Sequence, residues 1–255
     1  MLAAERKRLI LEKLQEDRKV VVSELSLLFD VSEETIRRDL DKLDKEGLCI
    51  KSYGGAVLNE SGGVEMPFTV RKKKNTDGKR KIAELVTELI SDGDHIFIDP
   101  STTGVAIASA LKPKKRLTVI TNSIEVLTEL ADQPGWDIIS TGGTLRENYL
   151  ALVGARAKES ILSFNADKAI ISCKGFDMRK GITDGNELFS EVKQSMLDSS
   201  KVHILAVDNS KFDTVAFSQI CDCNRVDIVV TDAKPSDEWM DFFAEKNIEI
   251  KYPGV

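Results

Sequence analysis

The chain has 255 residues, 42% of them hydrophobic and 31% charged, with a formal net charge of −6 at pH 7. These values are ordinary for a folded globular protein, and no apolar run approaches the roughly 20 residues that a membrane helix needs. The cysteines are too scattered for a disulfide framework or a four-ligand zinc site, so we expect no metal and no cofactor. The first residues lack the charged-then-apolar order of a signal peptide, which predicts a cytoplasmic protein with no membrane partner.

The charges are unevenly distributed along the chain. Residues 1–60 hold 11 basic and 13 acidic side chains, and residues 71–81 hold seven basic and one acidic. Residues 82–255 hold 18 basic and 27 acidic side chains, so the excess negative charge lies in the C-terminal part. Any contact with DNA must therefore come from local basic groups and helix geometry, and not from bulk attraction.

The N-terminal part is expected to begin with two short helices. Apolar residues on one face predict a helix over Arg6–Asp17, and a short extended link follows at 20–22. Ser23 is placed to cap a second helix, because its hydroxyl can accept a hydrogen bond from an early amide. The apolar stripe of this second helix consists of Leu25, Leu28 and Phe29. A tight turn at 30–31 then leads into a third helix.

The third helix and the segment after it have the pattern of a helix-turn-helix with a wing. Ser32 can cap this helix, and Gly47 stands where its C-terminus is expected. Its core-facing positions, spaced at i, i+4 and i+7, are Ile36, Leu40 and Leu43. The polar positions that this spacing turns outward are Glu34, Arg37, Arg38 and Asp41. Two strand-like pieces over Leu48–Val57 then predict a hairpin wing.

The candidate DNA contacts of this region are Ser32, Thr35, Arg37, Arg38, Lys51 and Tyr53. Adjacent arginines early in a recognition helix can bind guanine edges bidentately or clamp phosphates. Hydroxyls at the start of the helix lie beside free amides that favour a phosphate, and the last two candidates can contact the flanking backbone from the wing. The alternative is a plain three-helix bundle whose two arginines are solvated and paired with acidic neighbours.

The N-terminal motif is long enough to compare with a known family. From Val31 to Gly47 the sequence reads VSxxTIRRDLxxLxxxG, and YGGA follows from Tyr53. With the surrounding residues 6–57, it closely resembles the DNA-binding domain of the DeoR family of bacterial repressors, which implies binding to double-stranded operator DNA. The wing departs from the family, which often carries two basic residues and a histidine there. This chain has Ile50, Lys51 and Tyr53.

After a small polar segment at 59–63 and Pro67, the pattern changes to alternating strands and helices. The strand-like runs lie at 95–99, 117–121, 136–140, 168–172, 202–208, 227–232 and 248–252. Helical patterns lie at 77–91, 104–111, 123–131, 153–164, 187–199 and 237–246. This alternation predicts a mainly parallel sheet, so the fold class is an α/β sensor domain preceded by a small winged helix-turn-helix domain. The predicted DNA-binding domain spans 1–58, the linker 59–70 and the sensor domain 71–255.

Polar and glycine-rich loops follow the predicted strands. Because ligands of open α/β sheets bind beyond the carboxyl ends of the strands, we expect these loops to form one effector site. The candidates at the strand ends are Ser101, Thr102, Thr103, Thr121, Asn122, Thr141, Gly142, Gly143, Lys174, Gly175, Asp208 and Lys211. The loop at 181–187 adds two carboxylates suited to sugar hydroxyls, Asp184 and Glu187. Some of these residues also have a plainer interpretation: a capping turn at 101–103, a turn residue at Asp184, a helix N-terminal charge at Glu187, and surface lysines at Lys174 and Lys211.

Residues from about 71 to 252 look like the sensor domain of the DeoR family, whose fold is similar to that of ribose-5-phosphate isomerase and the CoA-transferases. The family's Asp-x-Gly-Thr-Thr motif stands at Asp99–Thr103 with a serine in place of the glycine. The Thr-Asn-Ser, Gly-Gly and Asp-x-Ser-Lys elements are intact. Leu188 and Phe189 replace glutamates that many members carry, which suggests a subgroup with its own effector. The resemblance implies a phosphorylated sugar as the ligand.

These features predict a sequence-specific repressor of a carbohydrate-catabolism operon that is relieved by a phosphorylated sugar. Because helix-turn-helix proteins read paired half-sites, we expect a homo-oligomer, a dimer or a tetramer. The alternative is a sugar-phosphate isomerase-like enzyme with an appended DNA-binding module. In that enzyme Asp184, Glu187 and Glu191 are possible bases, and Lys211 polarises a carbonyl. An activator is also open, since the sign of regulation depends on where the operator lies relative to the promoter.

Overall fold

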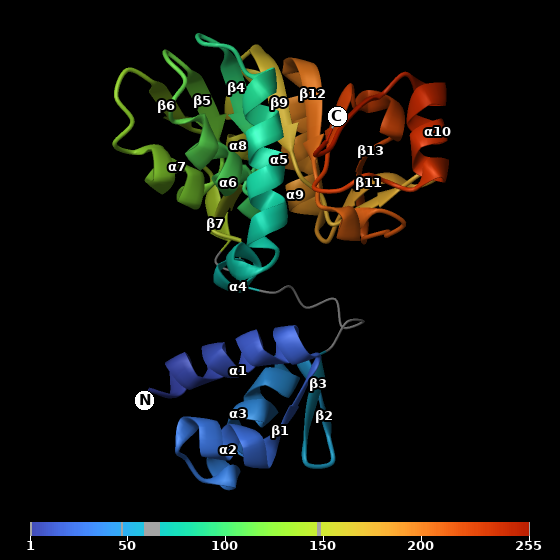
Figure 1. Cartoon of the computed structure of the whole chain (residues 1–255). Helices are drawn as coiled ribbons and strands as arrows, with labels where there is room; N and C mark the ends of the chain where they lie inside the picture. The colour runs from blue at the N-terminus through green and yellow to red at the C-terminus, as the bar shows by residue number, and fades with distance from the viewer. Residues whose placement is uncertain (1, 47, 59–66, 147–148, 255) are drawn as a thin grey trace. The chain divides into compact units, whose positions relative to one another are not determined.

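The computed structural model describes residues 2–46, 48–58, 67–146 and 149–254 (Figure 1). The chain divides into two compact units, residues 1–70 and 71–255. Residues 59–66, which make up most of the linker predicted at 59–70, lie outside the described residues. So does Gly47, where the end of the third helix was predicted. Within the described parts of the chain, no helix combines the length and apolar character needed to cross a bilayer.

The N-terminal unit has the predicted winged helix-turn-helix architecture. In chain order its elements are α1 (Ala3–Asp17), β1 (Lys19–Val21), α2 (Val22–Phe29), α3 (Glu33–Lys45), β2 (Cys49–Ser52) and β3 (Gly55–Leu58). The strands form an antiparallel sheet in the order β1-β3-β2. The segment predicted as an extended link is therefore a strand of the wing, because Lys19 to Val21 pair with Val57 to Gly55.

Two details of the second helix differ from the prediction. The helix begins at Val22, and its N-terminus has no side-chain cap, so the predicted role of Ser23 is wrong. Leu28 was expected in the apolar stripe, but it is 60% exposed, whereas Leu25 is buried. In this short helix only Val22 and Leu25 are fully buried. They pack in the core with residues of α3 and of the wing strands.

The core of this unit explains how α3 is held. It is built from Ile10, Leu14, Val20, Val22, Leu25, Ile36, Leu40, Leu43, Cys49 and Ala56. A buried ion pair joins the first helix to the third, with Arg6 Nε 2.6 Å from Asp39 Oδ2. Ser32 caps α3 as predicted, because its hydroxyl accepts a hydrogen bond from the Thr35 amide at 3.3 Å. The outer face of α3 is therefore presented by a fixed helix.

Two helices follow at the boundary between the units: α4 (Phe68–Lys73), which spans it, and α5 (Thr76–Leu89), which belongs to the second unit. Residues 68–70, which the sequence placed in the linker, are thus helical. Asn75 separates the two helices in the left-handed region, with φ of 47°, and its side chain accepts a hydrogen bond from the Gly78 amide. This cap turns the chain sharply between α4 and α5.

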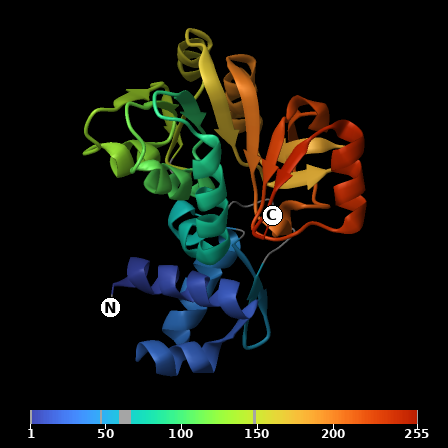
Figure 2. The same ribbon diagram turned by 45° about the horizontal axis from the view of Figure 1, so that its top comes forward.

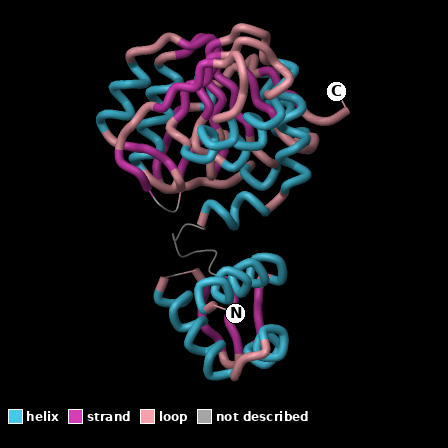
Figure 3. The backbone as a smooth tube through the Cα atoms, turned by 90° about the vertical axis from the view of Figure 1, so that its left-hand side faces the viewer, coloured by secondary structure: helices cyan, strands magenta, loops and turns pink. Residues whose placement is uncertain are grey.

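In the described part of the chain, seven parallel strands form the central sheet (Figure 3). They are β4 (His95–Ile98), β5 (Thr118–Thr121), β6 (Asp137–Ser140), β9 (Ala166–Ile171), β12 (Ser200–Ala206), β14 (Ile228–Val230) and β15 (Glu249–Lys251). Their order is β15-β14-β12-β9-β4-β5-β6, and each neighbouring pair is parallel. Each strand coincides with a run predicted from the sequence, so the α/β class is confirmed.

Helices cover both faces of this sheet. The remaining helices are α6 (Thr102–Leu111), α7 (Ile124–Leu130), α8 (Ala155–Leu162), α9 (Glu187–Asp198) and α10 (Asp237–Lys246). Helices α5, α6 and α7 pack side by side on one face, and α8 and α9 pack together on the other (Figure 1). From β4 the chain runs outward through β5 to β6, whereas from β9 it runs through β12 and β14 to β15. The direction reverses between β4 and β9, which is where such sheets bind ligands.

Short antiparallel strands were missed by the sequence analysis. They are β7 (Thr144–Arg146), β8 (Ala151–Val153), β10 (Gly175–Asp177), β11 (Gly181–Asp184) and β13 (Ser218–Cys221), with single 3-10 turns at Asn209–Lys211 and Cys223–Arg225. Strands β10, β11 and β13 form a small sheet beside α10 (Figure 2). The segment 181–187, predicted as a loop, is therefore largely strand. It pairs with β10, where Ile182 lies opposite Phe176, a member of an aromatic cluster with Phe212, Trp239 and Phe243.

Candidate DNA-binding helix and effector site

The outer face of α3 carries the predicted DNA-contacting arginines. Arg37 and Arg38 are both exposed, because the neighbouring Ile36 and Leu40 are buried in the core. Arg37 Nη2 lies 2.6 Å from Glu33 Oε2, so the pairing that the alternative interpretation expected does occur for this residue. An exposed pair one helical turn apart contributes only about 0.3–0.5 kcal/mol, so the guanidinium can exchange it for a phosphate or a base at little cost.

The start of α3 and the wing flank these arginines. The hydroxyls of Ser32 and Thr35 are 2.9 Å apart at the first turn. Lys51 of β2 pairs with Asp41 of α3, and this hydrogen bond raises the pKa of the lysine. Tyr53 is fully exposed at the turn between β2 and β3. The wing lysine therefore forms an exposed ion pair with α3, and the tyrosine ring is exposed to solvent at the tip of the wing.

A buried lysine organises the switch point of the large sheet. Lys193 of α9 is only 6% exposed, and its ammonium lies 2.6 Å from Asp184 Oδ2 and 3.1 Å from Asp99 Oδ2. It also donates to the Ser172 carbonyl at 2.7 Å, so three acceptors surround its three donors. Asp99 Oδ2 in turn accepts from the Ser172 amide at 2.9 Å. The network ties the ends of β4, β9 and β11 together.

The electrostatics of this network follow from burial and from the opposite charges. Burial alone would lower the pKa of Lys193, but Asp184 and Asp99 outweigh it and raise the pKa above its ordinary value. Burial alone would raise the pKa of Asp184, but Lys193 outweighs it and lowers that pKa. Both groups are therefore charged. Lys193 was not among the residues predicted from the sequence, although a lysine four residues after Phe189 and three before Met196, within an apolar helix face, is a signal for a buried cation.

Lys174 follows β9 on the same rim, beside an aromatic pair. Its ammonium lies 3.4 Å from the Tyr149 hydroxyl and 5.4 Å from the centre of that ring. The Tyr149 ring stacks on Phe189 with 3.8 Å between centroids. Burial lowers the pKa of Lys174 to about 8, against the opposing effect of Asp184. Lys174 is thus a half-buried cation at the predicted place, supported by aromatic rings that the prediction did not include.

Lys211 and Asp208 lie together after β12. The Lys211 ammonium is 3.9 Å from Asp208 Oδ2 and 3.3 Å from the Ser210 hydroxyl. Both charges also act on Lys79 of α5. Burial lowers the pKa of Lys79 to about 8; the charge of Asp208 opposes this shift, and the charge of Lys211 adds to it. Lys211 also lowers the pKa of Lys174. Lys211 therefore lowers the pKa of two other cations, Lys79 of α5 and Lys174 after β9.

The predicted hydroxyl residues are largely used within the fold. Ser101 caps α6, since its hydroxyl accepts from the Gly104 amide at 2.8 Å, and Thr102 and Thr103 are buried in the first turn. Thr121 donates to the Ile98 carbonyl at 2.6 Å. These four side chains therefore act mainly within the fold, as a helix cap, as a donor to the backbone and as buried packing residues.

Asn122 is different from these residues. Its amide donates to the Leu152 carbonyl at 2.8 Å, but its Oδ1 is buried with no hydrogen-bond partner among the described residues. Buried polar atoms are nearly always satisfied, so this oxygen calls for a donor such as a water or a sugar hydroxyl.

The predicted glycines divide into two kinds. Gly142 and Gly143 both have positive φ after β6, and a side chain at Gly143 would meet the Val153 carbonyl at 2.7 Å. Thr141, just before them, is buried, and its hydroxyl lies 3.1 Å from the Gly142 carbonyl. Gly175 lies within β10, where a side chain would meet the Thr214 carbonyl at 2.5 Å. The first pair forms a tight turn at the rim, and Gly175 allows close packing of the small sheet.

The carboxylates that the enzyme alternative required have three different environments. Asp184 is held by Lys193, Glu187 is exposed in the first turn of α9, and Glu191 lies 3.0 Å from Lys158. Burial raises the pKa of the Cys173 thiol well above its ordinary value, which keeps it protonated and unreactive.

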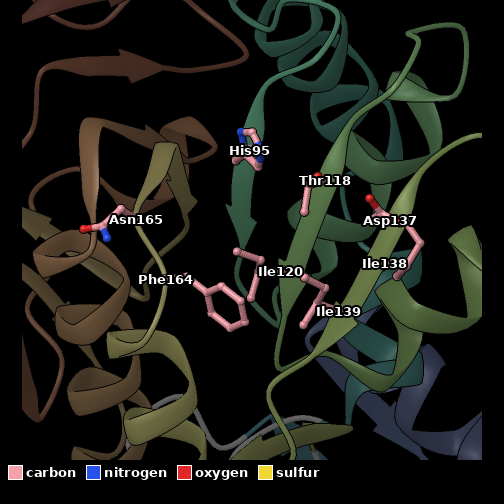
Figure 4. Close-up of a pocket in the computed structure, with 8 residues that line it drawn as sticks. All are labelled: His95, Thr118, Ile120, Asp137, Ile138, Ile139, Phe164 and Asn165. Carbon is pink, nitrogen blue, oxygen red and sulfur yellow. The ribbon is translucent and has the colours of Figure 1, made fainter.

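A hollow of about 370 Å³ lies at the other end of the central sheet (Figure 4). It is lined by His95, Thr118, Ile120, Asp137, Ile138, Ile139, Phe164 and Asn165. Three of these are the first residues of β4, β5 and β6, so the hollow lies at the amino ends of the strands. None of the predicted effector residues lines it. The interacting lysines and the switch point both favour the carboxyl ends as the ligand site.

Comparisons with known proteins agree with both halves of this description. Residues 6–62 match the DeoR-like helix-turn-helix domain, and residues 74–233 match the DeoR C terminal sensor domain. An uncharacterized HTH-type transcriptional regulator of Bacillus subtilis strain 168, YulB, is 38% identical over 98% of this chain and 96% of its own length. The glycerol-3-phosphate regulon repressor of Escherichia coli K12 is 32% identical over 95% of this chain and 96% of its own length.

Among solved structures, ribose 5-phosphate isomerase A from Methanocaldococcus jannaschii matches 55% of each chain, with a TM-score of 0.41 and 14% identity. A likeness of this strength does not establish shared chemistry. The two domain matches stand in order along the chain, and the relatives align over nearly its whole length. The chain therefore belongs to the DeoR family of helix-turn-helix transcriptional regulators.

Proposed function

We propose that the protein represses a carbohydrate-catabolism operon and releases its operator when a phosphorylated sugar binds the sensor unit. The observation that carries this proposal is the placement of two lysines after neighbouring strands, Lys174 after β9 and Lys211 after β12, with the charge of Lys211 lowering the pKa of Lys174. Cations held close together repel one another, and a phosphate dianion relieves that repulsion. The E. coli relative supports the assignment, since its name pairs repression with a phosphorylated polyol.

The proposed effector site has a charged part and a polar part. Lys174 and Lys211 bind the phosphate, and Asp208 and Asn122 accept hydrogen bonds from sugar hydroxyls. The loops at Ser101–Thr103 and at Thr141–Gly143 form the walls of the site through their backbone. Asp184 acts indirectly, because it fixes Lys193 and, through it, the ends of β4 and β9.

The proposed operator contacts come from α3 and the wing. Arg37 and Arg38 read base edges or phosphates, Ser32 and Thr35 bind phosphate at the helix start, and the wing contacts the flanking backbone through Lys51 and Tyr53. We propose that the protein acts as a homo-oligomer, a dimer or a tetramer, which would place two recognition helices on paired half-sites.

A thermal-unfolding screen of the full chain against pentose, hexose and triose phosphates tests the effector class. A ligand at 100 times its Kd stabilises by about 2.7 kcal/mol, which corresponds to a rise in Tm of about 5–10 °C for a unit of this size. The matched controls are the unphosphorylated sugars, which should give no rise. Binding should weaken between pH 7 and pH 9, because Lys174 loses its charge through a pKa of about 8. Equal stabilisation by the unphosphorylated sugars, or none by any phosphate, would contradict the proposal.

A further inference from the structure

The C-terminal end of α4 lies on the rim of the sensor unit. The Arg71 guanidinium carbon is 5.2 Å from the centre of the Tyr149 ring, the same ring that lies 5.4 Å from the Lys174 ammonium. Lys72 adds an ion pair with Glu125 in the first turn of α7, at 2.7 Å. Two cations from distant parts of the chain therefore each lie near the same aromatic ring, beside the proposed phosphate position.

Lys79 of α5 holds the C-terminal end of α4 in place through hydrogen bonds to its backbone. Its ammonium donates to the carbonyls of Arg71 at 2.6 Å and of Lys72 at 3.4 Å, and also to that of Lys74. The last carbonyls of a helix have no partner within the helix, so a buried ammonium is a strong cap for them. The backbone around Arg71 is thus fixed by a lysine whose pKa the charge of Lys211 also lowers.

The electrostatic environment at Arg71 favours an anion. Three cations, Arg71, Lys74 and Lys211, lower the pKa of Lys79, and the Asp208 carboxylate opposes them. A guanidinium binds phosphate oxygens in a bidentate manner, whereas a lysine acts as a single charge. Arg71 is half-buried, so its position is restricted without being closed to a ligand.

We propose that Arg71 is an effector-binding residue, which contacts the phosphate together with Lys174 and makes α4 a wall of the sensor site. This inference rests on the proposed function. Arg71 lies only five residues after the segment 59–66 that leads from the DNA-binding unit. Effector binding therefore acts directly on the first turns of chain that enter the sensor unit, and α4 is the element through which occupancy changes operator affinity.

Calorimetric titration of the full chain tests the contact. Inorganic phosphate, glycerol 3-phosphate, fructose 1-phosphate and glucose 6-phosphate are titrated at fixed ionic strength into the wild type, Arg71→Ala, Arg71→Lys and Lys73→Ala. Arg71→Ala should lose affinity by about 10-fold or more, and Arg71→Lys should keep only part of it. Lys73→Ala, which removes an exposed charge from the same helix, should bind as the wild type does. If Arg71→Ala binds the sugar phosphates as tightly as Lys73→Ala and the wild type do, the inference is overturned.

Hydrogen exchange of the wild type gives a second readout that needs no variant. Amides of residues 71–79 should exchange more slowly when a binding sugar phosphate is present, and unchanged exchange despite measured binding would overturn the inference even if Arg71→Ala fails to fold. A wild type that binds none of the probes would contradict the proposed function and this inference together. Binding without any dependence on Arg71 would contradict the inference alone.

Discussion

Replacing Arg37 by alanine is expected to weaken operator binding by roughly 5- to 150-fold, because a bidentate arginine contact to a base contributes about 1–3 kcal/mol of discrimination. The loss should be specific to the operator, so binding to unrelated duplex should change far less. Fluorescence anisotropy at a fixed salt concentration measures both affinities, using a duplex that the wild type selects from a random library. Arg38→Ala is measured in the same way.

The matched control for this variant is Arg8→Ala on α1. Arg8 is also exposed, and it also pairs with a glutamate one turn along, Glu12, at 2.6 Å. The Arg8→Ala substitution therefore removes the same charge and the same kind of ion pair as Arg37→Ala, but from another helix. If Arg37→Ala and Arg38→Ala both bind the operator as tightly as Arg8→Ala does, α3 is not the recognition helix.

Lys193→Met is expected to destabilise the sensor unit by about 3–5 kcal/mol, because it leaves Asp99 and Asp184 buried without their cation. Methionine fills a similar volume, so the loss comes from the uncompensated carboxylates and not from a cavity. Urea unfolding of the full chain, followed at the transition of the sensor unit, measures the change. The control is Lys201→Met, which removes an exposed lysine 2.9 Å from Asp167 and should cost less than about 1 kcal/mol.

The same ion pair sets a pH dependence. The pKa of Asp184 is lowered in the folded state, so its contribution is present above the pKa of the unfolded carboxyl and is lost as the pH falls through the folded value. The pKa of Lys193 is raised, so the lysine stays charged at all neutral and mildly alkaline pH values. The wild type should therefore lose sensor stability on acidification more steeply than Lys193→Met does. Identical acid profiles would show that the network adds nothing to stability.

The long, regular patterns of this sequence were enough to predict the main architecture. The seven parallel strands are apolar runs bounded by polar residues, and α3 repeats its apolar side chains at helical spacing. The missed strands have three or four residues each, as at Thr144–Arg146 and Gly175–Asp177. A run of that length shows no period, and its pairing depends on partners far along the chain. Long-range pairing also explains why residues 20–22 were predicted as a link, whereas residues 19–21 form a strand.

The position of the candidate site was predictable, but the use of its residues was not. Strand ends at a switch point place Asp99, Lys174 and Lys211 on one rim, as the alternation of elements predicted. A serine or threonine at such an end has the same sequence signal whether it caps a helix or binds a ligand, and Ser101 caps α6. Tyr149 reaches the rim from the turn between β7 and β8, which only the three-dimensional fold brings near Lys174.

The central claim is that effector occupancy and operator affinity are energetically linked. The most direct measurement is the operator affinity of the full wild-type chain, at fixed salt, with and without a saturating sugar phosphate that stabilises the sensor unit. The account predicts an affinity weakened by about 5- to 150-fold, the usual range of allosteric coupling, and an equal weakening of sugar-phosphate binding by the operator. An operator affinity that stays the same while the sugar phosphate is bound would contradict it.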